Sequence, residues 1–186
     1  MKVTINRAPV LTLWAAVVAE RLGFDAPAAL TLGKALAGYT AQTKGQLLGI
    51  YHPRPSEDSQ ESKDEPEADL VFVNLMGRAL PAMITPDGVR AVERGRPADP
   101  QGVRRYLQGK FGESLASTER AMRLLAASYH PDRLDVEAYG LYERFRPVVE
   151  KGKRGWGAEG VLDLDKVLGL RRGGAEPASG GTSKAR

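Results

Sequence analysis

A short acidic stretch divides this chain and limits how it can fold. From Ser56 to Asp69 the sequence SEDSQESKDEPEAD holds seven carboxylates and one lysine, Lys63, for a net charge of −6. It has no aliphatic or aromatic side chain before Ala68, so burial cannot offset the entropy lost on ordering it. We therefore expect a solvated linker with packed structure on either side. Since the whole chain carries +4, the remainder sums to +10.

The linker organises the chain into four parts. We expect a helical hairpin over residues 1–55, the disordered acidic linker over 56–69, a β-hairpin followed by helices over 70–170, and a disordered tail over 171–186. About 150 residues remain for packed structure, enough for one ordinary domain or for two small domains that share a core. The sequence thus predicts an α+β protein that is mostly α.

Apolar spacing predicts two helices before the linker. The first covers residues 9–22 and ends at Gly23, because its apolar residues recur at three- and four-residue intervals. The second runs to Ala37 and stops at Gly38. Over residues 42–51 we expect a loop or a short extended segment.

Beyond the linker, a hairpin precedes three helices. Residues 70–75 and 78–85 read as its two strands, and Pro81 in the return strand predicts an edge position. The helices are expected at residues 99–111, 114–129 and 132–145, with a glycine-rich loop at 151–160 and a short helix at 163–170.

No segment has the roughly 18 to 20 apolar residues of a membrane-spanning helix. Residues 1–19 allow a signal peptide, since Lys2 and Arg7 precede an apolar run that ends at Ala19. The helical pattern nevertheless continues through this point to Leu22. Cysteine is absent, which fits a reducing compartment. We expect a cytoplasmic protein that does not contact membranes.

The first two helices resemble a helix-turn-helix. Ala19, Gly23 and Leu32 match the small residue, the turn glycine and a buried position of that motif. The resemblance implies that the second helix reads DNA, for which it offers Thr31 and Lys34. The alternative is a plain αα-hairpin that packs the core.

Two shorter segments resemble known motifs. Residues 94–97, RGRP, resemble the core of an AT-hook, which lies in the DNA minor groove, and the alternative is a simple turn. Residues 121–133, AMRLLAASYHPDR, resemble part of a J-domain. That resemblance implies that His130, Pro131 and Asp132 stimulate ATP hydrolysis by a chaperone partner. The alternative is a helix break, with Pro131 opening the next helix.

Four further segments are similar to an uncharacterised bacterial protein family: WAAVVAERLGF, LTLGKALAG, LYERFRP and GWGAEGVLDLD. The resemblance implies a cytoplasmic bacterial protein and brings no activity with it.

Enzymatic function has little support in the sequence. There is no nucleophile elbow and no phosphate-binding loop, and the two histidines, His52 and His130, lie far apart. Asp163 and Asp165 offer metal ligands, but Asp163 as a helix cap is the simpler explanation of the pattern. We expect a protein that is not an enzyme and needs no cofactor or metal.

The leading prediction is a non-enzymatic protein that binds DNA or RNA, mainly through phosphate contacts. Arginine outnumbers lysine 18 to 9, and its planar fork suits phosphate, although a GC-rich genome produces the same bias. Trp156 either stacks on a base or fills a hydrophobic pocket. The alternative function is a protein-interaction module or a homo-oligomer. The predicted binding residues are Arg104, Arg105, Lys110, Lys151, Lys153, Arg154, Trp156, Arg171 and Arg172.

Overall fold

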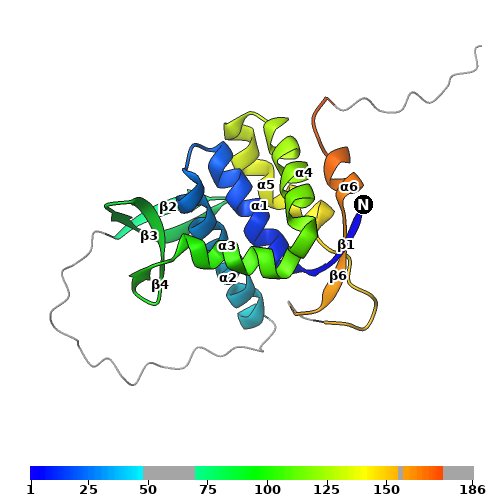
Figure 1. Cartoon of the computed structure of the whole chain (residues 1–186), viewed down its shortest axis with the longest axis horizontal. Coiled ribbons are helices and arrows are strands. Elements are labelled where there is room, and N and C mark those ends of the chain that lie inside the picture. The colour runs from blue at the N-terminus through cyan, green and yellow to red at the C-terminus, as the bar shows by residue number, and fades with distance from the viewer. Residues whose placement is uncertain (48–69, 155–156, 174–186) are drawn as a thin grey trace, which may run out of the picture.

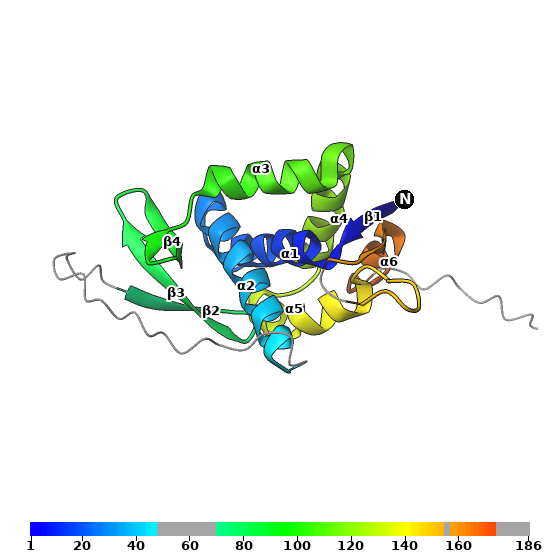
Figure 2. The same cartoon turned by 90° about the horizontal axis from the view of Figure 1, so that it is seen from below.

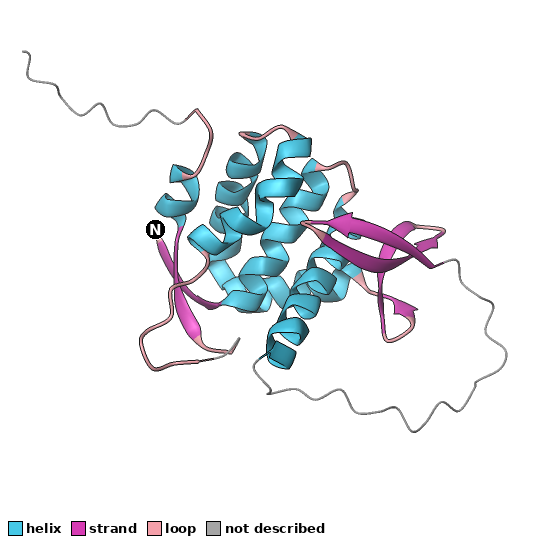
Figure 3. Cartoon of the chain, turned by 180° about the vertical axis from the view of Figure 1, so that it is seen from behind, coloured by secondary structure: helices cyan, strands magenta, loops and turns pink. Residues whose placement is uncertain are grey.

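A computed structural model describes residues 1–47, 70–154 and 157–173 (Figure 1). The predicted linker at 56–69, Trp156 and the tail from 174 lie outside the described residues. The protein has an α+β fold that is mostly α. A central group of helices carries a four-stranded sheet on one side, and a two-stranded sheet with a short helix lies on the other, as seen from behind in Figure 3.

The centre of the molecule is α1 (Arg7–Arg21), in which every residue from Pro9 to Ala19 is buried. It packs along α2 (Ala26–Leu47) and against α3 (Pro100–Phe111), α4 (Leu115–Ala127) and α5 (Pro131–Phe145). A 3₁₀ turn, η1 (Gly112–Ser114), joins α3 to α4. One hydrophobic cluster therefore includes side chains from both sides of the acidic stretch.

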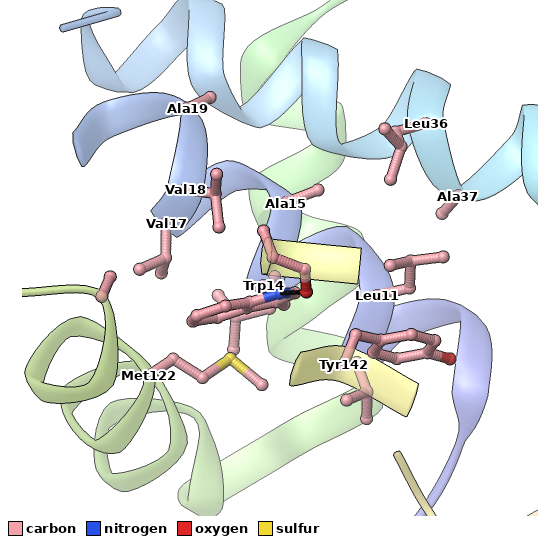
Figure 4. Packing of buried hydrophobic residues seen from close by; sticks show 14 of the residues in the cluster. Leu11, Trp14, Ala15, Val17, Val18, Ala19, Leu36, Ala37, Met122 and Tyr142 are labelled. Atoms are coloured by element: carbon pink, nitrogen blue, oxygen red, sulfur yellow. Dashed lines mark hydrogen bonds between the residues drawn. The ribbon is translucent and has the colours of Figure 1, made fainter. Parts of the chain in front are cut away.

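Trp14 shows how the core is fixed across the chain (Figure 4). Its side chain is fully buried, and its Nε1–H donates to the carbonyl oxygen of Ala138 in α5 at 2.9 Å. Its ring meets that of Phe145 edge-on, with 5.4 Å between centroids. Because the indole N–H has a partner, the burial of this large side chain leaves no unpaired donor.

The helix positions agree with the sequence, apart from one boundary. Asp99 caps α3 and accepts hydrogen bonds from the backbone N–H groups of Gln101 and Gly102, both at 3.0 Å. The prediction that the second helix stops at Gly38 is wrong, because α2 continues to Leu47. Gly38 keeps a helical backbone, and the segment expected to be a loop from residue 42 begins inside the helix.

The predicted hairpin is part of a larger sheet. Its strands are β2 (Leu70–Leu75) and β3 (Arg78–Thr85), which continue into β4 (Gly88–Glu93) and β5 (Arg96–Pro97) as an antiparallel meander. Two-residue turns join β2 to β3 and β4 to β5, each with both residues at positive φ, as tight hairpins require. The RGRP segment is therefore the β4–β5 turn and the strand after it.

Pro81 does not lie in an edge strand, as we expected, because β3 is flanked by β2 and β4. The pairing of β3 with β4 covers only Ala82 to Thr85. Residue 81 lies just outside this register and is paired only on its other side, with Phe72 of β2.

A second sheet was not predicted. The strands β1 (Lys2–Asn6) and β6 (Glu159–Asp163) pair antiparallel, joining the two ends of the described chain. Part of the expected glycine loop is therefore a strand. The short helix α6 (Leu164–Gly169) follows, and Asp163 caps it by accepting from the Asp165 N–H at 3.0 Å.

The start of the tail also differs from expectation. Residues 171–173 are ordered against the helices, because the backbone N–H of Arg172 donates to the Ser128 hydroxyl at 3.0 Å. None of the described helices is both long enough and apolar enough to cross a membrane.

Candidate nucleic-acid interface

The structure does not bring the predicted binding residues together. Figure 2 shows α3, which carries Arg104, Arg105 and Lys110, along one side of the molecule. The loop that carries Lys151 and Lys153 lies across the molecule from it. Arg154 ends the described part of that loop, and Arg171 and Arg172 follow α6. The predicted binding residues that the structure describes therefore form no single surface.

Several of these cations already have partners. Arg104 lies 3.7 Å from a Glu119 oxygen, Arg105 lies 3.6 Å from Asp99, and Lys153 lies 3.4 Å from Glu150. Arg172 contacts Glu137 at 3.0 Å, and Arg171 donates to the Leu168 carbonyl oxygen. These exposed pairs are weak, but each one reduces the positive field available to an anion.

The candidate base-reading side chains of the second helix both contact neighbouring elements of the fold. Thr31 is fully buried, donating to the Ala28 carbonyl oxygen and accepting from the Ala91 N–H at 3.0 Å. The Lys34 ammonium lies 3.7 Å from the ring centroid of Tyr106 in α3. The first helix pair thus has the arrangement of an αα-hairpin in the core.

The His-Pro-Asp segment begins a helix. Pro131 is the first residue of α5, and His130 precedes it with an exposed ring whose Nδ1 lies 3.6 Å from an Asp132 oxygen. Only three residues separate α4 from α5, so the segment forms a short break between helices.

A different group of cations does converge. We call it the cationic face, and it comprises Arg7, Lys44, Arg78 and Arg146. They come from α1, α2, β3 and the residue after α5. The Arg78 guanidinium lies 5.6 Å from the ring centroid of Tyr39 and 6.0 Å from that of Tyr139, so it sits near two aromatic rings. Such contacts hold a planar cation in place.

Charges of both signs act on one another at this face. The pKa of Lys44 is lowered first by burial and then by the positive charges of Arg146 and Arg7, whereas Glu143 opposes the shift. The pKa of the Tyr139 hydroxyl is raised, mainly by burial and also by Glu143. The face thus carries several positive charges close to the Glu143 carboxylate.

A groove runs beside this face between α2 and the four-stranded sheet. It has a volume of about 410 Å³, and we call it the α2 groove. Glu93 and Arg94 lie at its edge. Its helical wall is formed by Thr31, Lys34, Ala35, Gly38, Tyr39 and Gln42, and its sheet wall includes Leu80, Pro81, Ala91 and Val92.

Tyr39 lies beside Arg78 of the cationic face and also lines the α2 groove, and it is 44% exposed. Neither Tyr39 nor Lys44 was predicted to lie at a binding surface, because the second helix was predicted to end at Ala37. Extending the helical spacing by two turns would have placed both residues on it. No local signal points to Arg7, Arg78 or Arg146, since their meeting depends on the tertiary fold.

In the part of the chain that the structure describes, no three histidine or carboxylate side chains lie close enough to hold a metal ion. No family model, no curated protein and no solved structure matches this chain.

Proposed function

We propose that this protein binds nucleic acid as a non-enzymatic protein, through contacts between the cationic face and phosphates. One observation carries the proposal: the Arg78 guanidinium is held beside two tyrosine rings and close to a cluster of further positive charges. Arginine binds phosphate through a planar fork, and aromatic contacts pre-orient that fork. We also propose a cytoplasmic location, where nucleic acid is the abundant polyanion.

The cationic face is a better candidate than the residues expected from the sequence. Four of those nine residues contact carboxylates, and α3 and the 151–154 loop lie on different sides of the molecule. The positive charges of the cationic face come from four distant segments, and those of Arg146 and Arg7 both act on Lys44. A bound polyanion would release counterions there.

Fluorescence anisotropy with a labelled DNA duplex tests the proposal. Affinity should fall steeply between about 50 and about 200 mM salt, because each neutralised phosphate releases counterions. The double substitution Arg78→Gln and Arg146→Gln should weaken binding about tenfold or more and reduce the salt slope by about 2. The Arg104→Gln and Arg105→Gln double variant removes the same charge from α3 and should bind like the parent protein.

Two results would contradict the proposal. One is an unchanged anisotropy of the labelled duplex at about 50 mM salt and micromolar protein. The other is an equal loss of affinity in the α3 double variant, which would assign the contact to the residues expected from the sequence.

A second candidate function is self-association through β2, the outer strand of the four-stranded sheet. Its sequence, LVFVNL, has no charge and no proline, and Leu70 and Phe72 are 58% and 70% exposed. Edge strands usually carry charged residues or prolines that prevent pairing with another chain. Because β2 has neither, its sequence suits pairing with a second copy. Light scattering should then give a dimer mass that Phe72→Lys reduces to that of a monomer. A monomer before the substitution rejects this candidate.

A further inference from the structure

The α2 groove and the cationic face meet at Tyr39. The ring of Tyr39 lies near the Arg78 guanidinium on one side and forms part of the groove wall on the other. Lys34 and Arg94 also line the groove. A strand of phosphates that follows the cationic face would therefore pass the open groove.

The shape and lining of the groove suit a flat, partly polar group. The helical wall spans residues 31 to 42, which is about 16 Å at the rise of an α-helix. The walls carry apolar side chains such as Leu80 and Val92, whereas Gln42 and Glu93 offer hydrogen-bonding groups. A volume of about 410 Å³ lies within the usual range of small-ligand sites. Nucleobases combine flat faces with polar edges.

We propose that the α2 groove receives an unpaired base stacked beside Tyr39, so that the preferred partner is single-stranded nucleic acid. This inference rests on the proposed function, since the phosphates must first lie on the cationic face. Bases within a duplex are stacked and paired and cannot enter a side groove without being extruded, which costs free energy. A single strand offers its bases freely, and stacking on an aromatic ring tolerates any sequence.

Charge favours this occupant over an apolar peptide. Lys34 and Arg94 line the groove against a single carboxylate, Glu93. Arg78 contacts Tyr39, and Lys44 lies two residues beyond Gln42 on α2. Positive charge therefore accompanies the groove along its length, as expected where a negatively charged backbone crosses it.

Gly38 provides a selective way to fill the groove. It lies on α2 with a helical backbone, and a Cβ atom added there would meet no heavy atom within 4 Å. Leucine has a higher helix propensity than glycine, so Gly38→Leu should fold while its side chain occupies the groove. Gly109 on α3 is also exposed, with nothing within 4 Å of an added Cβ, and lies outside the groove. Gly109→Leu is therefore the matched control.

The experiment compares an oligothymidylate with a DNA duplex of the same length by anisotropy at low salt. The parent protein should bind the single strand more tightly than the duplex. Gly38→Leu should weaken single-strand binding about tenfold and leave duplex binding unchanged, whereas Gly109→Leu should change neither. Tyr39→Ala removes the ring without filling the groove. Because Tyr39 also lies beside Arg78, this variant should weaken binding of both nucleic acids, and single-strand binding by the larger factor.

The outcomes separate this inference from the proposed function. If both nucleic acids bind equally and neither Gly38→Leu nor Tyr39→Ala changes the preference, the inference is overturned while phosphate binding stands. If neither nucleic acid binds, the proposed function fails and the inference with it. Thermal unfolding of each variant shows whether it is folded, and if Gly38→Leu does not fold, Tyr39→Ala alone decides.

Discussion

At the scale of single residues, Gly33 determines how closely α1 and α2 approach each other. A Cβ atom added at this position would lie 2.5 Å from the carbonyl oxygen of Thr12 and 2.9 Å from the backbone nitrogen of Ala16. Both are backbone atoms of α1 and cannot rotate away. The contact between α1 and α2 therefore depends on the absence of a side chain at this position.

Gly33→Ala should lower the free energy of unfolding by about 1–3 kcal/mol, because α2 would have to move away from α1. Gly38→Ala, five residues later on the same helix, should raise it by about 0.5–1 kcal/mol, since a Cβ has space there and alanine favours the helix. Urea unfolding of both variants measures the difference. Equal effects would show that the close approach at Gly33 is relieved without cost.

Most features that could be predicted from the sequence involve single residues and their near neighbours. Asp99 caps α3, and Asp163 caps α6, as their spacing from the following helices indicated. Gly23 follows α1 with φ 109°, as expected for a glycine that ends a helix. Each of these features depends on residues within a few positions, so the sequence displays it directly.

At the scale of elements, the pairing of β1 with β6 was not predictable. The partners Val3 and Leu162 lie at opposite ends of the described chain, and each strand has only five residues. Short strands that pair across such a separation leave no turn signal between them. Their side chains alternate between buried and exposed, so one face of this small sheet lies against the core.

Leu162→Ala should destabilise the protein by about 2–5 kcal/mol, because its fully buried side chain would leave a cavity. The neighbouring Val161 is 42% exposed, and Val161→Ala should cost less than about 1 kcal/mol. Thermal or urea unfolding compares the two variants. A small effect at Leu162 would show that β6 can detach without loss of the core.

At the scale of the whole molecule, the main finding is the distribution of charge. Composition predicts a basic protein, and Arg104, Arg105 and Lys110 lie on a helix, and Lys151 and Lys153 in a loop, as predicted. Their spatial relation was not predicted, since α3 and the 151–154 loop lie on different sides. The cations that do meet, such as Lys44 and Arg146, come from segments about 100 residues apart.

Local patterns in the sequence are enough to predict the α+β class, the helices after the acidic stretch, the β2–β3 hairpin and the helix caps. These features follow from periodicity and from contacts between near neighbours, which any window of a few residues contains. The β1–β6 pair, the shared core around α1, and the meeting of Arg78 with Tyr39 and Tyr139 arise only in the folded molecule. They depend on which buried faces fit together, and that long-range packing leaves no local pattern in the chain.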